Sequence, residues 1–251
     1  MTIRVLAPAK LTWSLRVVGV RDDGYHLIDA EMVTLDLADE LTIDEAGPAG
    51  LTVSGPFADG VPTDESNLVM KALRLAGRVA SVHVAKHIPN GGGLGGGSAD
   101  AAAVLRWAGV DDARIAVRLG ADVPFCLAGG RARVRGIGEV LEPLPPVART
   151  VTLVIPPLNS STPAVYRAWD ELGGPTVDGP NDLEPAAIAI EPRLAEWRDR
   201  IADLAGAMPA LAGSGATWFV EGDHMTALDG LRPDGATVVV ARTVGPSVTR
   251  R

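Results

Sequence analysis

The sequence has a single cysteine, Cys126, and no long apolar run among its 251 residues. One cysteine cannot form a disulfide within the chain, which is typical of proteins from a reducing compartment. No apolar run approaches the roughly 18 residues that a membrane-spanning helix needs, and residues 1–10 lack the long apolar stretch of a signal peptide. We therefore predict a soluble, cytoplasmic protein that does not act at a membrane.

Positive charge is also scarce in this sequence. The 23 lysines and arginines stand against 31 aspartates and glutamates, which gives a net charge of −8 and a sequence pI near 5.0. A surface that wraps nucleic acid must be basic, so DNA or RNA binding is disfavoured as the main role. Only three of the basic residues are lysines: Lys10, Lys71 and Lys86. Each of them is informative, because arginine cannot act as a compact, titratable ammonium.

Glycine is the residue that the sequence has in excess. It contains 29 glycines and 19 prolines, which is more glycine than an average chain has, although the two together stay below the proportion found in low-complexity disordered chains. The glycines must therefore be concentrated in particular turns and loops. With 47% apolar residues, the chain can bury the core of one large domain or of two small ones.

The periodicity of apolar residues predicts strands and helices that intermix without strict alternation. We expect strands at residues 2–6, 11–18, 31–43, 51–53, 81–85, 129–140, 151–155, 217–221 and 236–243. We expect helices at residues 64–78, 98–105, 111–119, 162–172 and 192–206. Pro8 separates the first two strands, because proline argues against one continuous central strand. The mixture favours an α+β fold over a doubly wound parallel sheet, with two domains, residues 1–147 and 148–251, joined near the proline-rich segment 141–146.

A glycine-rich loop is the strongest local signal in the sequence. Six of the seven residues from Gly91 to Gly97 are glycine, and a strong predicted helix follows directly from Ser98. Glycines let a backbone approach an anion closely, and the first turn of a helix offers unpaired N–H donors and a partial positive charge. A flexible linker or a tight packing turn is the alternative, but linkers seldom run straight into so well defined a helix. We predict a phosphate-binding loop.

Two common phosphate motifs do not fit this loop. A P-loop requires a lysine directly after its last glycine, and no lysine follows here. The pattern G-x-G-x-x-G can be read from Gly91 to Gly96. However, a dinucleotide fingerprint leaves its strand directly into the glycines, whereas residues 86–90, with a proline, intervene here.

The segment at residues 89–102 resembles the central ATP motif of the GHMP kinases, which include galactokinase and the homoserine, mevalonate and phosphomevalonate kinases; it reads Pro-Asn-Gly-Gly-Gly-Leu-Gly-Gly-Gly-Ser-Ala-Asp-Ala-Ala. Further segments resemble other motifs of that family, in the family's order: residues 7–11, 21–26, 119–125, 181–184 and 211–216. One such motif would be weak, but this ordered set spans nearly the whole chain. Within the family, the motifs are most similar to the branch that acts on a cytidine-diphosphate-linked polyol.

The resemblance implies both a fold and a reaction. The fold would have an N-terminal domain like ribosomal protein S5 and a C-terminal ferredoxin-like domain, with the substrates in the cleft between them. The reaction would be ATP-dependent phosphorylation of the 2-hydroxyl of 4-diphosphocytidyl-2-C-methyl-D-erythritol, in non-mevalonate isoprenoid precursor biosynthesis, with no obligate protein partner.

Two alternatives to this reaction stay open. The chain could be another small-molecule GHMP kinase, of the mevalonate, homoserine or sugar type. It could also be a nucleotide-binding protein that has lost catalysis. Thr12 stands where the family usually has asparagine, and Ala99 stands where it usually has a second serine; both would be signs of such decay.

Two residues match the catalytic positions of the family. The resemblance implies that Asp122 is the base that takes the proton of the acceptor hydroxyl. It also implies that Lys10 holds that carboxylate ionised and polarises the hydroxyl. From the residues alone, Asp122 before Val-Pro is better explained as a helix N-cap, and Lys10 as a solvated lysine at a strand start; the surrounding motifs favour the catalytic interpretation instead. If they form a catalytic pair, their side-chain heads must approach within roughly 3–4 Å.

The resemblance also implies the ATP site. The matching residues are Asn67, Lys86, Pro89, Asn90, Gly91, Gly92, Gly93, Leu94, Gly95, Gly96, Gly97, Ser98 and Ala99. Asn67 and Lys86 would line the adenosine side, although Asn67 could equally belong to the first turn of its helix. We expect Mg²⁺ to be held chiefly by the nucleotide phosphates, with few protein ligands and Ser98 as a candidate contact. His83 and His87 are four residues apart in an extended segment, which does not predict a metal site.

The acceptor side is implied by a smaller set of residues. Tyr25 and His26 match positions that hold the cytidine of the substrate, and an aromatic ring can stack on a pyrimidine. From the residues alone, Tyr25 is as well explained as a turn aromatic and His26 as a surface residue. The remaining matching residues are Thr12, Gly213, Ser214 and Gly215. The last three would close the cleft from the second domain.

Overall fold

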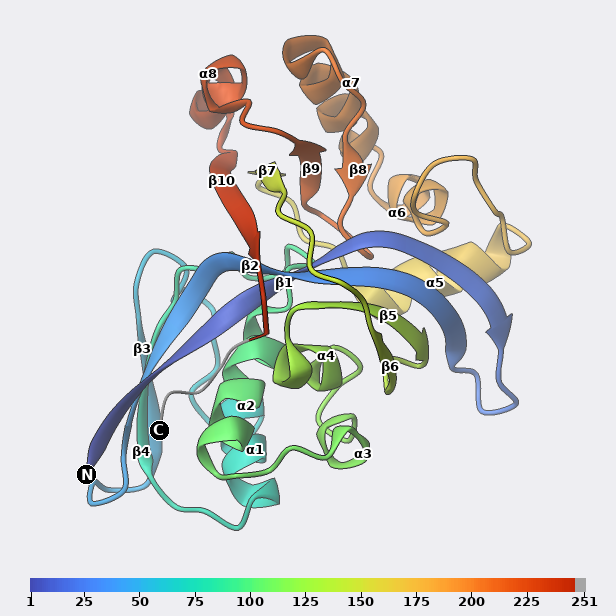
Figure 1. Ribbon diagram of the computed structural model, residues 1–251. Coiled ribbons are helices and arrows are strands. Elements are labelled where there is room, and N and C mark those ends of the chain that lie inside the picture. The colour runs from blue at the N-terminus through green and yellow to red at the C-terminus, as the bar shows by residue number, and fades with distance from the viewer. Residues whose placement is uncertain (247–251) are drawn as a thin grey trace.

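The computed structural model describes residues 1–246 and has two halves joined by a shared mixed sheet (Figure 1). In the N-terminal half the elements are β1 (Thr2–Val20), β2 (His26–Asp44), β3 (Gly50–Ser54), α1 (Leu68–Leu75), β4 (Ser81–Ala85), α2 (Gly96–Trp107), α3 (Ala113–Ala116), α4 (Val123–Ala128), β5 (Arg131–Gly136) and β6 (Val140–Pro143). In the C-terminal half they are β7 (Thr150–Ile155), α5 (Thr162–Glu171), α6 (Glu184–Ile190), α7 (Arg193–Ala205), β8 (Ala210–Leu211), β9 (Trp218–Glu221), α8 (Met225–Leu228), a 3₁₀ helix (Asp229–Asp234) and β10 (Thr237–Val244). Every helix of the described residues falls short of the length and apolar character that spanning a bilayer requires.

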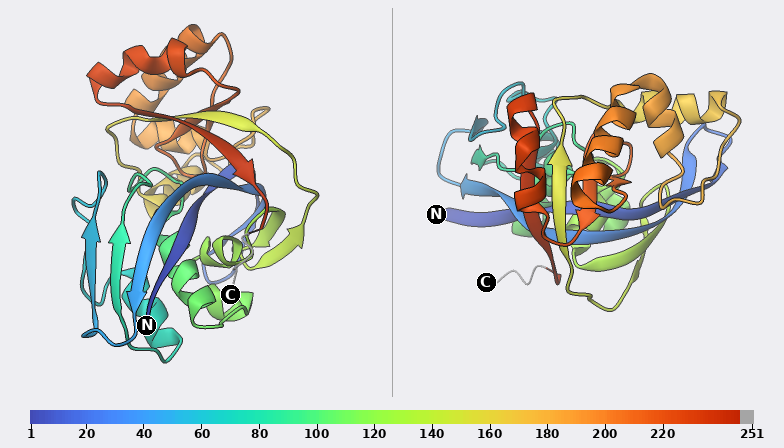
Figure 2. Two further views of the ribbon diagram at one scale, coloured as in Figure 1. Left: turned by 60° about the vertical axis from the view of Figure 1, so that its left-hand side comes forward. Right: turned by 90° about the horizontal axis from the view of Figure 1, so that it is seen from above.

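The longest strands, β1 and β2, form an antiparallel hairpin that crosses the molecule (Figures 1 and 2). The break that the sequence predicts at Pro8 is wrong, because β1 is continuous and only shifts register between Pro8 and Lys10. Among the described strands, β1 pairs with β2 alone, apart from a single bridge at Leu15, and proline is tolerated on such an edge strand. On this open edge the Lys10 amide donates a hydrogen bond to the Leu94 carbonyl at 3.0 Å. The edge therefore holds Lys10 beside the glycine loop.

Strand β2 pairs with three further strands along its length and so connects the two halves. Its residues 28–33 pair with β5, Thr34 and Leu35 pair with β10, and residues 40–44 pair with β4. Strand β10 continues into the C-terminal half, where it pairs with β7, and β7 pairs in turn with β9. Figure 2 shows β10 running from the C-terminal strands to the hairpin. Strand β10, the last strand of the described residues, thus joins the two halves.

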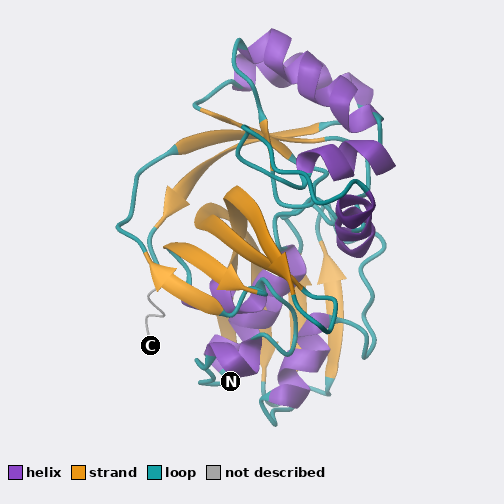
Figure 3. Ribbon diagram, turned by 90° about the vertical axis from the view of Figure 1, so that its right-hand side faces the viewer, coloured by secondary structure: helices purple, strands orange, loops and turns teal. Residues whose placement is uncertain are grey.

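Helices gather at two ends of the molecule, with the strands running between them (Figure 3). Helix α2 packs in the N-terminal core through a run of buried alanines, Ala99 and Ala101–Ala103, whose small side chains allow a close approach to neighbouring elements. Cys126 of α4 is buried in the same core, and this burial raises the pKa of its thiol to about 12. A second core combines the C-terminal half with buried residues of β1, β2, α4 and β5, and it contains Trp169, Trp197 and Trp218.

Most of the predicted elements are present, with shifted ends. The helix predicted at residues 64–78 is limited to α1, and the helix predicted at 111–119 is reduced to the four residues of α3. Helix α6 was not predicted. The predicted linker 141–146 overlaps β6, so regular structure is absent only after Pro143 and until β7 begins. The domain boundary at residues 147/148 stays a prediction, and the last residues of the predicted second domain, 247–251, lie outside the described residues.

Candidate active site

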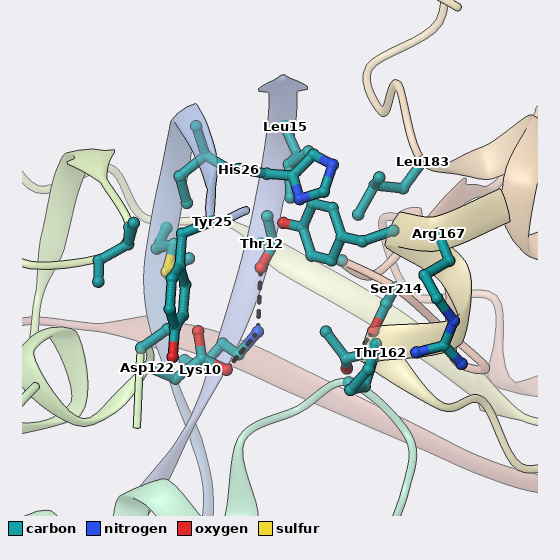
Figure 4. Close-up of a pocket in the computed structure, with 18 of the residues that line it drawn as sticks. Lys10, Thr12, Leu15, Tyr25, His26, Asp122, Thr162, Arg167, Leu183 and Ser214 are labelled. Atoms are coloured by element: carbon teal, nitrogen blue, oxygen red, sulfur yellow. Dashed lines mark hydrogen bonds and ion pairs between the residues drawn. The ribbon is translucent and has the colours of Figure 1, made fainter. Parts of the chain in front are cut away.

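A cleft of about 480 Å³ opens between the hairpin, the glycine loop, α4 and α5 (Figure 4). The predicted site residues that line it are Lys10, Thr12, Tyr25, His26, Gly93, Asp122, Gly213 and Ser214. The other lining residues are ones that the sequence analysis left without a role: Leu15, Gly24, Ile28, Met32, Ala121, Ile137, Thr162, Pro163, Tyr166, Arg167, Asp170 and Leu183. Segments from both halves of the chain therefore meet in one cleft.

Lys10 and Asp122 form an ion pair in this cleft. The distance from Lys10 Nζ to Asp122 Oδ2 is 3.2 Å, and the exposed fractions of the two side chains are 6% and 32%. Asp122 occupies the N-cap position of α4, but its side chain makes no capping hydrogen bond. The capping interpretation therefore does not account for this carboxylate. Both side chains line the cleft, and the carboxylate is the more exposed of the two.

Two neighbours fix the position of the Lys10 side chain. Lys10 Nζ donates a hydrogen bond to Thr12 Oγ1 at 3.1 Å, and Thr12 is itself buried. The other neighbour is Gly95, where a Cβ atom would lie 2.8 Å from Lys10 Cγ and where φ is +71°. Any larger residue at position 95 would displace the lysine and strain the backbone. The glycine loop therefore helps to hold Lys10, and with it the Lys10–Asp122 ion pair, in position.

The glycine loop ends at the N-terminus of α2. Gly95 is the N-cap of α2 and adds no side-chain hydrogen bond, so no side chain blocks the donors of the first turn. The loop also contacts the C-terminal half, because a Cβ on Gly93 would overlap the carbonyl oxygen of Ala212. Ser98 in the first turn is half-buried, and its hydroxyl has no hydrogen-bond partner in the described part of the chain. Of the other predicted loop residues, Gly91 and Gly97 are exposed, Gly96 is half-buried, and three are buried: Pro89, Gly92 and Leu94.

Four of the residues predicted for ATP line a smaller pocket of about 290 Å³. Those that line it are Asn67, Lys86, Asn90 and Gly97. Asn67 is the N-cap of α1, since its Oδ1 accepts a hydrogen bond from the Val69 amide at 2.8 Å. Asn90 Nδ2 donates to the Phe57 carbonyl at 2.6 Å. Ala99 lies elsewhere, because its side chain is buried in the N-terminal core.

Lys86 lies in a buried ionic cluster beneath the glycine loop. Its side chain is 2% exposed, and its Nζ is bonded to a carboxylate oxygen of Asp39 and to Asp100 Oδ2, the latter at 2.6 Å. Burial acts to lower the pKa of Lys86, but the charges of Asp100 and Asp39 outweigh it and the pKa is raised. Burial also raises the pKa of Asp100 to about 7, although the charge of Lys86 opposes this. Lys86 is therefore a neutralised structural cation beside the pocket.

We expect Asp100→Asn to remove part of the dependence of stability on pH. The pKa of Asp100 is raised from 3.8 to about 7 in the folded protein, so the folded state keeps a proton that the unfolded state loses across this window. The proton on Asp100 stabilises the folded protein fully at pH values below the pKa of the unfolded state, 3.8. This stabilisation is lost as the pH rises towards the pKa of the folded state, about 7. Relative to wild type, the variant should gain about 2 kcal/mol in free energy of unfolding from about pH 5 to pH 7. Urea unfolding at several pH values measures this change.

The matched control for this prediction is Asp111→Asn, because Asp111 is exposed and lies outside the cluster. This variant leaves Asp100 in place, so the gain expected for Asp100→Asn should be absent from it. A constant difference between Asp100→Asn and wild type would contradict the raised pKa.

His26 is surrounded by aromatic rings from α5. Its ring centroid lies 4.6 Å from that of Tyr166 and 5.6 Å from that of Trp169, which meets it edge-on. His26 Nε2 lies 2.8 Å from Asp170 Oδ1. Tyr25 is exposed at the rim of the cleft, and Figure 4 shows it on the same side as Asp122. The sequence predicts roles for Tyr25 and His26 but gives no signal for Tyr166, Trp169 and Asp170 of α5, because nothing local marks which helix packs on the hairpin.

The turn at residues 211–215 is held by a residue that the sequence analysis quoted without a role. Asn181 is buried, and its Nδ2 donates to the carbonyl oxygens of Leu211 and Gly213 at 2.8 and 2.7 Å. A Cβ on Gly213 would lie 3.5 Å from Thr12 Oγ1 and 3.7 Å from Lys10 Nζ, so the turn lies against these two side chains. Ser214 Oγ lies 2.7 Å from Thr162 Oγ1.

Gly215 does not line the cleft, and its position instead faces the side chain of Leu211. The neighbouring Asp182 accepts hydrogen bonds from Arg16 Nη1 at 2.7 Å and from the Val17 amide at 3.1 Å. These bonds attach the segment that carries Asn181 to β1. In the sequence, these contacts of Asn181 and Asp182 are indicated only by the resemblance of residues 181–184 to a family motif.

The arrangement supplies the parts that phosphoryl transfer to a hydroxyl requires. The carboxylate of Asp122 can accept a proton, the ammonium of Lys10 can stabilise charge on an oxygen, and the loop with the N-terminus of α2 can receive phosphate groups. Within residues 1–246, no group of three histidine, cysteine or acidic side chains could hold a metal ion.

Comparisons with known proteins agree with this chemistry. Residues 67–130 match the model of the GHMP kinases N terminal domain. The chain is 43% identical over 235 residues to 4-diphosphocytidyl-2-C-methyl-D-erythritol kinase of Paracoccus denitrificans, covering 86% of this chain and 85% of that protein. It is 41% identical over 247 residues to the protein of the same name from Paramagnetospirillum magneticum, covering 85% of this chain and 86% of that protein.

Solved structures extend the similarity to the fold. A crystal structure of 4-(cytidine 5'-diphospho)-2C-methyl-D-erythritol kinase matches with a TM-score of 0.78 at 34% identity, over 97% of this chain and 100% of that one. Homoserine kinase from Cytophaga hutchinsonii matches with a TM-score of 0.66 over 98% of this chain and 95% of that one. Its identity is 17%, so this second likeness is one of fold alone.

Proposed function

The chain belongs to the GHMP kinase family of ATP-dependent small-molecule kinases and has the two-domain fold of that family, and from this premise we propose that it phosphorylates 4-diphosphocytidyl-2-C-methyl-D-erythritol. The acceptor is the 2-hydroxyl group, and the step belongs to the non-mevalonate synthesis of isoprenoid precursors. Relatives that carry this substrate in their name cover most of the chain, which supports the choice. We place the reaction in the cytoplasm, where the unpaired thiol of Cys126 stays reduced.

The observation that carries the proposal is the ion pair of Lys10 and Asp122, 3.2 Å apart in a cleft between two different binding surfaces. The carboxylate takes the proton of the acceptor hydroxyl as the phosphoryl group is transferred. The ammonium stabilises the negative charge that develops on the acceptor oxygen. Thr12 keeps the ammonium in place through its hydroxyl. The usual asparagine at position 12 is therefore replaced by a residue that still holds Lys10.

The nucleotide side is formed by the glycine loop and α2. The loop leaves the N-terminus of α2 without a side-chain cap, which favours binding of the ATP phosphates there. We propose that Mg²⁺ enters with ATP and is held chiefly by the phosphates, as is usual for this ion; when bound, it neutralises phosphate charge. The unpartnered hydroxyl of Ser98 is the candidate protein ligand. Ala99 is buried and carries no hydroxyl that could add to this contact.

The acceptor side is formed by aromatic residues. Tyr25 is exposed at the rim and Tyr166 lies inside the cleft, and either ring can stack on a cytosine base. His26 is kept in one orientation by Asp170 and by its packing on Tyr166. This aromatic wall favours a cytidine-bearing acceptor over homoserine or mevalonate, which have no ring to stack.

A coupled assay of ADP release tests the proposed function. With ATP and Mg²⁺, we expect turnover with 4-diphosphocytidyl-2-C-methyl-D-erythritol and at least about 100-fold lower kcat/KM with mevalonate, homoserine or galactose, because each lost stacking contact costs roughly 1–3 kcal/mol and the pyrophosphate contacts are lost too. CMP should inhibit competitively against the cytidine substrate. A higher kcat/KM with one of the other acceptors would replace the proposed substrate. ATP binding without turnover on any acceptor would favour a protein that has lost catalysis.

A further inference from the structure

Arg167 on α5 is a charged residue of the cleft that none of the steps above uses. It lines the cleft and is exposed. The other lysine, histidine and aspartate side chains that line the cleft are paired with one another: Lys10 with Asp122, and His26 with Asp170. In the described part of the chain, Arg167 has no hydrogen bond, ion pair or aromatic contact from its side chain. It is therefore an uncompensated cation in the cleft.

The local sequence would lead one to expect a partner for this arginine. Asp170 follows Arg167 by three residues on the same helix, a spacing at which opposite charges commonly pair. Asp170 Oδ1 instead lies 2.8 Å from His26 Nε2. Arginines of the adjacent sheet are paired in the ordinary way, as Arg131 is with Glu31 and Arg133 with Asp29. In a protein of net charge −8, a cation without an acidic partner at this position is suited to an anion from outside the chain.

Arg167 lines the same cleft as Lys10 and Asp122. Figure 4 shows Arg167 projecting from α5, with Thr162 and Ser214 between it and the Lys10–Asp122 pair in that view. The hydroxyls of Thr162 and Ser214 are bonded to each other at 2.7 Å and offer Arg167 no charge. A guanidinium presents a planar fork of donors that matches phosphate oxygens. The proposed substrates bring phosphate groups to this cleft from two sources, the diphosphate of the cytidine substrate and the transferred phosphoryl group of ATP.

We propose that Arg167 binds a phosphate group of the bound substrates. The inference rests on the proposed function, since that function brings phosphates to this wall of the cleft. The glycine loop offers backbone donors but contains no cation. Arg167 supplies a cation from the C-terminal half. The residue adds affinity and orientation for an anion, while Asp122 and Lys10 remain the groups that act on the acceptor hydroxyl.

Arg167→Gln and Arg167→Lys test the proposal, with Arg118→Gln as the matched control, because Arg118 is exposed and lies outside the cleft. Steady-state kinetics are measured with each substrate varied. If Arg167 binds the cytidine diphosphate, Arg167→Gln raises KM for that substrate roughly 10- to 100-fold, the effect of losing a charge-assisted hydrogen bond, and leaves KM for ATP unchanged. If it binds the transferred group, Arg167→Gln lowers kcat by a similar factor. Arg167→Lys should recover part of either loss, because it keeps the charge without the fork.

Calorimetry separates failure of this inference from failure of the proposed function. Titrations use CDP, CMP and ADP as probes with wild type, Arg167→Gln and Arg118→Gln. If wild type does not turn over the cytidine substrate, the proposed function fails, but a loss of CDP or ADP affinity confined to Arg167→Gln still supports phosphate binding. Kinetic constants and affinities of Arg167→Gln within about twofold of those of Arg118→Gln would overturn the inference.

Discussion

Asp122→Asn lowers kcat by about 10³-fold in the expected result, within the range of 10²–10⁴-fold that general base catalysis contributes. The amide has nearly the shape of the carboxylate but cannot accept the proton of the acceptor hydroxyl. Since the 32% exposed side chain of Asp122 makes no capping bond to α4, the substitution should leave the helix and the fold intact. KM for ATP should change little, because the nucleotide side is built by the glycine loop and α2. Coupled release of ADP measures the loss.

The control for this prediction is Asp111→Asn, which removes one exposed carboxylate outside the cleft. It should match wild type in both kcat and KM. A thermal melt of Asp122→Asn that coincides with that of wild type separates lost chemistry from lost folding. Equal rates for wild type and Asp122→Asn would remove Asp122 as the base.

The local parts of this site could be predicted from the sequence because short-range physics determines them. Six glycines followed by an alanine-rich segment specify a loop that ends in a helix N-terminus, and the structure has that junction at Gly95 and Gly96. The error at Pro8 has the same origin. Proline excludes a central strand, and the sequence does not show that β1 is an edge strand to which this exclusion does not apply.

The parts of the site that could not be predicted depend on contacts between distant residues. His26 and Asp170 are 144 residues apart in the sequence and 2.8 Å apart in the structure. That contact exists because α5 packs against the end of the hairpin, which no local pattern specifies. Arg167 was missed for the same reason, since its lack of a partner is a consequence of where Asp170 lies.

Lys86 shows that residue type alone does not determine the role of a lysine. The scarcity of lysine singled it out together with Lys10, and both lie next to the glycine loop. Lys86, however, is enclosed by Asp39, which is 47 residues earlier in the chain, and by Asp100. Burial with two carboxylates makes it part of the scaffold beneath the loop, whereas Lys10 faces a carboxylate that is open to the cleft. The difference between the two lysines lies in their partners.

Lys10→Met tests the other half of the proposed catalytic pair. Methionine preserves the length of the side chain and removes the ammonium, so the charge that develops on the acceptor oxygen loses its stabilisation. We expect kcat to fall by about 10²–10³-fold, the cost of removing one donor from such a site. The fold should tolerate the change with a loss of less than about 1 kcal/mol, because the partially exposed Asp122 can be solvated by water in place of its partner. Lys71→Met, at an exposed position of α1, should keep full activity.

A double variant, Lys10→Met with Asp122→Asn, shows whether the two side chains act as a unit. Groups that act together give strongly non-additive losses, as removing a second member of a catalytic set costs little once the first is gone. Because the ammonium and the carboxylate are 3.2 Å apart and serve the same proton and oxygen, we expect the double variant to lose about as much kcat as Asp122→Asn alone. A loss equal to the product of the two single losses would mean that Lys10 acts independently, on the phosphoryl group and not on the acceptor hydroxyl. Retention of kcat within a few-fold of wild type in Lys10→Met would exclude the ammonium from the chemical step altogether.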